Sequence, residues 1–453
     1  MQKTIALMTG CLGLLCFGPI APTWAQKPTS RPASRASATR PVAPASRPTK
    51  SASLSKVKVP SFSSVQPKAG ASAAKKQSNA PNPMSRVNYL MDMQLTKIKT
   101  FLHKFLQVHG RDPKNPWLLA HSLLALGKDL KLANGQLAID RIVSGYLRSK
   151  KVGKKTIYYF PQGTQKNRIE PHPHMHLKTF LALGVPMSRT FKVNGENVTL
   201  RQIYQSALMT LPAKLGTDPG KYAWLLHALY GRLQPYHWNW VNAKGELVRF
   251  FRVLFEYFKH TDKQVSFLRV MERRGVKQIP KRGQYIYKEP CGGFHMLQSA
   301  MRWMKYPMFS KKLTPLFDAQ VELIFYRFKG EMNLYVSLFK KYQKHPAYRF
   351  LILLQQLKFL GHWLETLVKL REWKLFTPSP AQRLQIRHAA KSLVLTVALL
   401  HRLGFYQRLP QLKKRVYQYY LDLLGDSAHA LHALKDLEQY PIHHIYPLKK
   451  KKK

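Results

Sequence analysis

Apolar residues recur at helical spacing through most of the chain between residues 87 and 447, and this pattern limits the fold more than any other feature. Several short apolar stretches begin after a proline or a polar turn and stop at a glycine, as in residues 116–127. Longer amphipathic stretches are expected at 246–271, 348–373, 381–403 and 412–424, with a last short helix after Asp426-Ser427. The sequence therefore predicts an all-α domain.

Strand signals in the sequence are few and short. Asn194-Gly195-Glu196 stands between two short β-prone runs and is a strong hairpin turn. Residues 157–160 and 284–287 are expected to be edge strands. We expect a few short β-hairpins at one rim of the helical domain.

Two segments, residues 170–176 and 289–295, repeat the pattern Glu-Pro-(His or Cys)-x-x-x-His, and each leads into an apolar helical stretch. The spacing of four places the His or Cys of each motif and its final His on one face of a helix start. Two such pairs could converge on a common point. Zinc binds His nitrogen and Cys sulfur in tetrahedral sites.

These two motifs define the candidate chemistry. The predicted metal ligands are His172, His176, Cys291 and His295, with zinc as the expected ion. Glu170 and Glu289 are the candidate catalytic carboxylates, which would orient a ligand histidine or act as a general base on bound water. The alternative is purely structural, because prolines start helices and the two glycines of the second motif allow close packing.

Histidines also stand inside apolar helices a few residues before a glycine. The pairs are His121 with Gly127, His176 with Gly184, His227 with Gly231, and His401 with Gly404. Repeated helical pairs indicate stacked or circularly closed hairpins. Together with Cys291-Gly292-Gly293-Phe294-His295, this layout over residues 87–440 resembles the α/α-toroid architecture. Terpene cyclases, protein prenyltransferase β-subunits, lanthionine-cyclase-like enzymes and many polysaccharide-active proteins share that architecture.

The resemblance implies a central cavity, with the N-termini of inner helices opening toward one rim. Residues expected to bind a ligand there are Trp117, His121, His174, Trp224 and His227. The chain lacks an acidic terpene-cyclase motif and the Cys-His-Gly signature of lanthionine cyclases, and it has Glu289 where prenyltransferases have Asp. The activity of one family is therefore not transferred. The aromatic run at residues 236–240 suits either a sugar-binding cleft or a helical core.

The N-terminus indicates export. Lys3 precedes an apolar run, and Thr23-Trp24-Ala25 resembles a cleavage site, so residues 1–25 are expected to be a signal peptide. Residues 26–86 carry twelve Lys or Arg and no Asp or Glu, which predicts a disordered basic segment. The helical domain is expected at 87–447 and a Lys tail at 448–453. We expect a soluble protein, located in the periplasm or outside the cell.

Cleavage after residue 25 would leave Cys291 as the single cysteine of the mature chain. No disulfide within the chain is then possible, and a lone thiol in an oxidising compartment is unusual. The thiol could be buried and inert, bound to a metal, catalytic, or paired with a second chain. A nucleophilic role would use His295 as the base.

The chain has 75 Lys or Arg against 21 Asp or Glu, a formal net charge of +54. Such a charge concentrates polyanions at a surface, unless it reflects a general bias of the source proteome. The expected partner is an anionic polymer, either a cell-envelope polysaccharide, lipopolysaccharide or nucleic acid. The first hypothesis is thus a non-catalytic protein that binds an anionic envelope polymer or glycan; a zinc-dependent enzyme and a metal-free carbohydrate-active enzyme are the alternatives.

Overall fold

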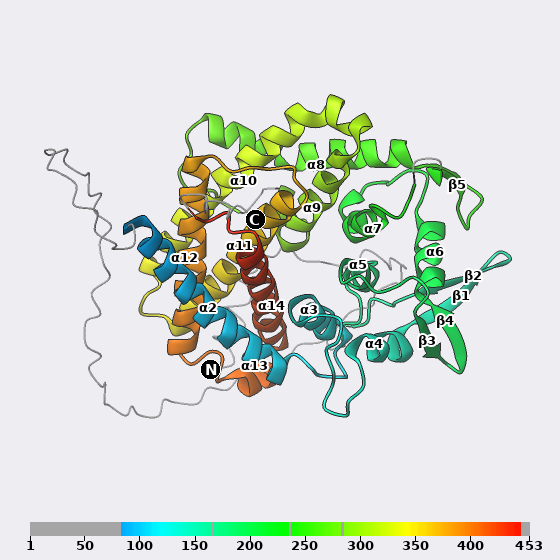
Figure 1. Cartoon of the computed structure of the whole chain (residues 1–453), viewed down its shortest axis with the longest axis horizontal. Helices are drawn as coiled ribbons and strands as arrows, with labels where there is room; N and C mark the ends of the chain where they lie inside the picture. The colour runs from blue at the N-terminus through cyan, green and yellow to red at the C-terminus, as the bar shows by residue number, and fades with distance from the viewer. Residues whose placement is uncertain (1–82, 165–166, 235–236, 282–284, 445–453) are drawn as a thin grey trace, which may run out of the picture. The chain divides into compact units, whose positions relative to one another are not determined.

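The computed structural model describes residues 83–164, 167–234, 237–281 and 285–444 (Figure 1). The predictions for residues 1–25 and 448–453, and nearly all of those for 26–86, lie outside these residues. The described part is mainly helical, which confirms the predicted class. Its α-helices are α2 (Pro83–His109), α3 (Pro116–Leu126), α4 (Ala138–Tyr146), α5 (Met175–Ala182), α6 (Leu200–Thr210), α7 (Ala223–Leu229), α8 (Phe250–Arg273), α9 (Phe294–Arg302), α10 (Pro307–Lys341), α11 (Pro346–Glu372), α12 (Pro380–Arg402), α13 (Leu409–Arg415) and α14 (Tyr417–Gln439).

Helix capping follows the sequence closely. The Asn115 side chain caps α3 by accepting from the Leu118 backbone N–H, and Thr199 and Ser379 form capping boxes at the starts of α6 and α12. No helix in residues 83–444, apart from the gaps named above, is long and apolar enough to span a bilayer.

Three antiparallel hairpins decorate the helices: β1 (Arg148–Val152) with β2 (Lys155–Tyr159), β3 (Thr190–Val193) with β4 (Glu196–Thr199), and β5 (Asn239–Val241) with β6 (Leu247–Arg249). The β3–β4 hairpin is the predicted one, and its turn residues Asn194 and Gly195 both have positive φ. The labelled strands lie on the side of α4 and α6 (Figure 1).

The edge strand predicted at 284–287 is wrong. Tyr285–Tyr287 form a short 3-10 helix, and residue 284 lies outside the described residues. Ile286 is fully buried against Gly293, where an added Cβ would approach its side chain to 2.2 Å. Tyr287 donates a hydrogen bond to Glu331. Packing against the Cys291 segment, rather than strand pairing, therefore sets this conformation.

The helix break predicted near Asp426 is also wrong, since α14 continues from Tyr417 to Gln439. Gly425 is in mid-helix because Trp117 of α3 packs directly on it; an added Cβ would meet the Trp117 ring at 2.5 Å. A glycine costs helix stability, and here close packing of two helices explains it.

Among the described helices, one set forms a closed cycle of contacts, in which each helix packs on the next and the last packs on the first. Contacts join α3 to α5, α5 to α7, α7 to α9, α9 to α11, α11 to α14, and α14 back to α3. Helices α2, α4, α8, α10 and α12 pack on members of this set. Each member also carries a histidine that is buried or partly buried: His121, His176, His227, His295, His362 and His429. Polar side chains are therefore enclosed where these helices meet.

Candidate functional site

Helices α11 and α14 run side by side in the same direction and share a row of polar side chains, here called the polar seam (Figure 1). Its α11 members are Lys358, His362, Glu365 and Lys369, and its α14 members are Asp422, Asp426, His429, His432 and Asp436. Steps of three or four residues keep each row on one helix face. A charged stripe on the buried faces of two helices calls for a functional explanation.

Short distances group the side chains of the polar seam into two stretches. The Nζ atom of Lys358 lies 3.7 Å from Asp422 Oδ1 and 3.9 Å from Asp426 Oδ2. Further along, His429 Nδ1 lies 2.7 Å from Glu365 Oε2 and His432 Nδ1 lies 3.5 Å from Glu365 Oε1. At the far end, Lys369 Nζ lies 3.2 Å from Asp436. Titratable groups thus follow one another through the middle of the helices.

The centre of this row, with two residues from the second Glu-Pro motif, forms the central cluster: Cys291, His295, His362, Glu365 and His429. Ligand atoms of Cys291, His295 and His362 all lie within 4.8 Å of one another. His362 is fully buried, and neither of its ring nitrogens has a hydrogen-bond partner among the described residues. Buried imidazole nitrogens normally form hydrogen bonds or bind a metal, so the two ring nitrogens of His362 call for a partner.

A second trio, His362, Glu365 and His429, also has ligand atoms within 4.8 Å. Here a hydrogen bond already joins two members, because His429 Nδ1 lies 2.7 Å from the Glu365 carboxylate. The two trios share His362. The trio with Cys291 is therefore the one whose lone pairs remain available to a cation.

The backbone presents Cys291 in an unusual way. Cys291, Gly292 and Gly293 have φ values of 53°, 63° and 78°, and only the glycines adopt such angles freely. Left-handed backbone at a cysteine stores strain that surrounding contacts must hold, as occurs at functional sites. The contact of Ile286 with Gly293 and that of Arg327 with Gly292 hold this segment against α9.

The protonation of the central cluster suits a metal ion. Burial lowers the pKa of His295 and of His362 well below the ordinary value, so both rings are neutral and offer a lone pair. Burial raises the pKa of Glu365, but the charge and hydrogen bond of His429 bring it well below normal. Burial also raises the pKa of Cys291 to about 12. Without a metal the thiol stays protonated, which argues against a nucleophilic cysteine.

Two aromatic pairs flank the central cluster. The His172 ring stacks on Trp224 at 4.4 Å between centroids, and Trp224 lies 5.0 Å from the His295 ring. The Trp117 ring lies 4.0 Å from His121, which in turn lies 5.3 Å from His429. His121, His172 and Cys291 are partly exposed, whereas His362 is buried. The central cluster therefore meets the solvent on the side of these partly exposed residues.

The two carboxylates predicted as catalytic have different surroundings. Glu170 is buried and accepts from the backbone N–H groups of His174 and His176, so it caps α5. Glu289 lies against Gly220, and its Oε1 is 3.2 Å from Nε2 of His260 on α8. Within the described part of the chain, the hydrogen bonds and ion pairs of both carboxylates are made with residues outside the central cluster.

Three predicted histidines also have roles outside the central cluster. His174 begins α5 with a positive φ, and His176 Nε2 lies 2.9 Å from the Ile169 carbonyl while its ring packs on Phe160. His227 faces Trp373 at 5.8 Å. Of the predicted site residues, the structure brings together His121, His172, Trp117, Trp224, Cys291 and His295. The histidine beside Cys291 and His295 is His362, not the predicted His176.

The aromatic run at 236–240 belongs largely to the core. Trp238 is buried, donates to the Leu233 carbonyl and packs on Phe309 at 5.7 Å, and Trp240 donates to the Leu208 carbonyl. Tyr236 lies outside the described residues. These indoles hold the β5–β6 hairpin against its neighbours, so the structural interpretation fits them better than a sugar-binding one.

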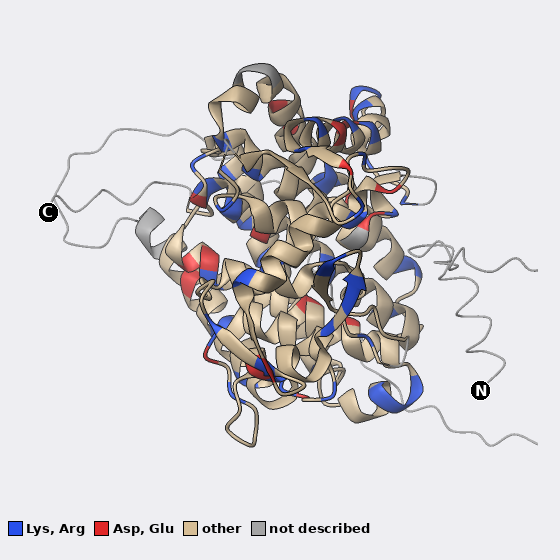
Figure 2. Ribbon diagram, turned by 90° about the vertical axis from the view of Figure 1, so that its right-hand side faces the viewer, with Lys and Arg blue, Asp and Glu red and all other residues tan. Residues whose placement is uncertain are grey.

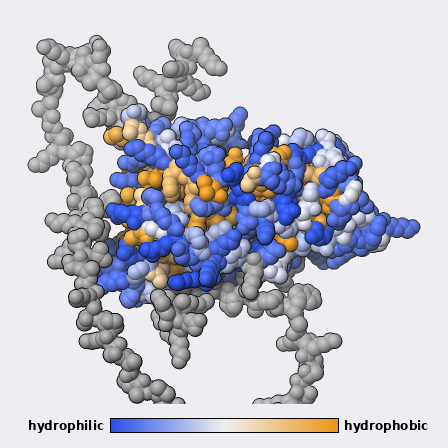
Figure 3. All heavy atoms as spheres, turned by 90° about the horizontal axis from the view of Figure 1, so that it is seen from below, coloured by the Kyte–Doolittle hydropathy of each residue, from blue (hydrophilic) through white to orange (hydrophobic). Residues whose placement is uncertain are grey.

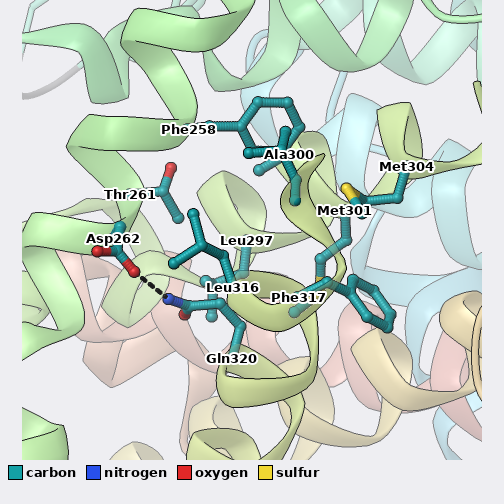
Figure 4. Close-up of a pocket in the computed structure, with 11 residues that line it drawn as sticks. Phe258, Thr261, Asp262, Leu297, Ala300, Met301, Met304, Leu316, Phe317 and Gln320 are labelled. Atoms are coloured by element: carbon teal, nitrogen blue, oxygen red, sulfur yellow. Dashed lines mark hydrogen bonds between the residues drawn. The ribbon is translucent and has the colours of Figure 1, made fainter. Parts of the chain in front are cut away.

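A separate cavity of about 30 Å³ lies between α8, α9 and α10 (Figure 4). Phe258, Leu297, Met301 and Phe317 line it, and its polar rim is the Asp262–Gln320 pair. The lining is apolar and carries no cluster of catalytic groups. It has no member in common with the central cluster.

Comparisons with protein-family models, with curated proteins and with solved structures found no match. The site's chemistry must therefore be argued from its own residues.

The sequence analysis missed His362, Glu365, His429 and the rest of the polar seam. A signal for them is present, because residues 358, 362, 365 and 369, and 422, 426, 429, 432 and 436, repeat at helical spacing within strongly apolar helices. Charged residues at those steps normally mark a solvated face. Only the contact of α11 with α14 shows that this face is buried.

Acidification is expected to destabilise the fold. Burial lowers the pKa of His172 and His174 to about 4 and of His176 to about 3, whereas burial raises that of Glu170 to about 8. Near pH 5.5 the unfolded chain binds nearly three more protons at these imidazoles, and the folded chain holds about one more at Glu170. These four groups alone should lower the free energy of unfolding by about 2 kcal/mol per pH unit as the pH drops from 6.5 toward 4.5. Urea unfolding with chelator at several pH values measures this, and a flat or opposite dependence would contradict the burial of these rings.

Proposed function

We propose that this chain is a zinc-dependent enzyme, with the ion bound by Cys291, His295 and His362. The observation that carries the proposal is the fully buried His362, whose ring nitrogens lack hydrogen-bond partners beside a cysteine and a second neutral histidine. A thiolate and two imidazoles are a typical zinc donor set. Binding zinc would also ionise the Cys291 thiol, since the metal charge opposes the effect of burial.

The same proposal includes an α/α-toroid architecture. It is supported by the closed order of contacts through α3, α5, α7, α9, α11 and α14, with other helices packed around them. The N-terminal ends of three of these helices, or the turns before them, carry Trp117, His172 and Cys291. That placement agrees with a site at the rim where the inner helices begin.

The chemistry would be metal-assisted hydrolysis. A zinc ion held by these three ligands would leave a fourth position for water and would lower the pKa of that water to near 7. His429 is the proton acceptor in this scheme, because its Nδ1–H donates to Glu365 and its Nε2 is left as the base. Glu365 fixes the tautomer and stabilises the imidazolium that forms. His432 and Asp436 continue the row of titratable groups away from the metal.

An anionic glycan or envelope polymer is the proposed substrate class. The indoles of Trp117 and Trp224 flank the central cluster, and such rings stack on sugar faces. Lys and Arg outnumber Asp and Glu along the described ribbon (Figure 2). The face in Figure 3 is mostly hydrophilic, with apolar side chains in patches between. Binding of such a polymer without catalysis, in the periplasm or outside the cell, stays a prediction.

One observation favours a second candidate, metal-free glycan cleavage. Asp422 and Asp426 lie within 3.7 and 3.9 Å of Lys358, and Trp117 packs on Gly425 between them. Burial raises the pKa of Asp426 well above normal, which keeps it protonated as a general acid requires. Paired carboxylates are what glycoside hydrolysis needs. This activity would survive chelation, whereas zinc-dependent hydrolysis would not.

Cobalt substitution tests whether the metal position is open. The full chain is loaded with Co²⁺ and titrated with acetohydroxamate, a small zinc-binding probe. A thiolate-to-cobalt band that arises on loading and shifts when the probe is added is expected for an open site, because among the proposed metal ligands only Cys291 supplies a thiolate. Glu289→Gln is the matched control, because Glu289 pairs with His260 and should leave both spectra unchanged. A thiolate-to-cobalt band that does not change with the probe would indicate a closed, structural metal and would exclude the enzyme.

A further inference from the structure

Asp92, His443 and His444 converge at a place distant in sequence from the central cluster. Asp92 belongs to α2, and the two histidines follow α14. The Nε2 atom of His443 lies 2.9 Å from Asp92 Oδ1, and that of His444 lies 3.0 Å from Asp92 Oδ2. One carboxylate therefore faces two imidazoles that are adjacent in the sequence.

We propose that Asp92, His443 and His444 form a second zinc site, which fastens the segment after α14 to α2. Their ligand atoms all lie within 4.8 Å of one another, and two histidines with one carboxylate are a recurrent zinc donor set. This site is independent of the central cluster and shares no residue with it.

The spacing fits a metal after a small adjustment. Ligands about 2.0 Å from a tetrahedral zinc ion are about 3.3 Å apart. The present N···O distances of 2.9 and 3.0 Å would widen by only a few tenths of an ångström. No change of rotamer is needed, because both Nε2 atoms already point at the carboxylate.

Burial and charge also suit the ion. His443 is 1 % and His444 is 6 % exposed, whereas the Asp92 side chain is 43 % exposed. The fourth position therefore opens to water on the Asp92 side. Neither Nδ1 atom has a hydrogen-bond partner among the described residues, so Asp92 is the group that orients both rings. Asp92 is also the single acidic residue of α2.

A structural interpretation without metal is simpler: two imidazoles donate to one carboxylate. Arg387, which donates to Asn88 on α2, adds positive charge nearby and opposes a cation. The two interpretations differ in one measurable way. Only the metal interpretation predicts that the zinc content of the chain depends on the charge of the Asp92 carboxylate.

The test is zinc content of the full chain after dialysis in micromolar zinc, by mass spectrometry. Asp92→Asn keeps a hydrogen-bond acceptor but removes the charge, and it should lose one zinc ion per chain and the zinc-dependent rise in Tm. Cys291→Ser/His295→Ala should keep that ion, which separates this site from the proposed function. The proposal is overturned if Asp92→Asn holds as much zinc as the parent chain. It also fails if the Cys291→Ser/His295→Ala variant holds none.

Discussion

Replacing His362 by alanine is expected to release the zinc ion of the central cluster. The affinity should fall by more than about 100-fold, because losing even a hydrogen-bond partner of a metal ligand costs about 10–100-fold. His362 is fully buried beside Cys291 and His295, and the neighbouring His429 is already hydrogen-bonded to Glu365. Zinc content and competition with a chromophoric chelator measure the change.

His176→Gln is the matched control for that variant. The sequence pattern predicts His176 as a ligand, whereas in the structure its Nε2 lies 2.9 Å from the Ile169 carbonyl and its ring packs on Phe160. The variant should keep zinc at the central cluster. Both variants are compared in the Asp92→Asn background, so that zinc bound by Asp92, His443 and His444 does not enter the count. In that background, zinc that survives His362→Ala, or that leaves with His176→Gln, would contradict the ligand set proposed from the structure.

Replacing Glu331 by leucine is expected to cost about 3–5 kcal/mol of stability. Glu331 is fully buried, and its carboxylate lies 2.9 Å from Arg327 Nε and 3.0 Å from Lys281 Nζ. Its loss leaves the buried Arg327 cation without this partner. Urea unfolding measures the loss.

The double variant Arg327→Met/Glu331→Leu is the control, because it removes the fully buried Arg327 cation together with Glu331 and should cost less than Glu331→Leu alone. Lys281, the other cation beside Glu331, is present in both variants. The Arg327 guanidinium also lies 4.3 Å from the Phe294 ring centroid and contacts Gly292. Glu331→Leu should therefore weaken zinc binding as well. A single variant as stable as the parent chain would show that the ion pair does not hold the Cys291 segment.

Local patterns predicted most of the helices and the β3–β4 hairpin, because proline starts, glycine stops and the Asn-Gly turn act through the nearby backbone. The errors arose where a distant contact decides. The sequence predicts one helix ending at residue 424 and another after Asp426-Ser427, yet Trp117 of α3 packs on Gly425 within a continuous helix. Residues 285–287 alternate like a strand, yet Ile286 is fixed by Gly293.

In the candidate site too, the sequence predicts what neighbouring residues decide and misses what distant contacts decide. Cys291 and His295 stand four residues apart on one helix start, so the sequence alone paired them. Their third partner, His362, comes from another helix, and its neighbours in the sequence do not distinguish it from an ordinary amphipathic position. Glu170 and Glu289 match in the repeated motif, but the first caps α5 and the second meets His260. A shared pattern does not fix a shared role.

The most direct test of the zinc site is X-ray absorption at the zinc edge on Asp92→Asn, which leaves the central cluster as the proposed site. The proposed centre predicts one sulfur ligand at about 2.3 Å and two imidazole nitrogens at about 2.0 Å, with a fourth light atom from water. The sulfur should disappear in Cys291→Ser. A spectrum with no sulfur ligand, or a chain that takes up no zinc, would contradict the proposed centre.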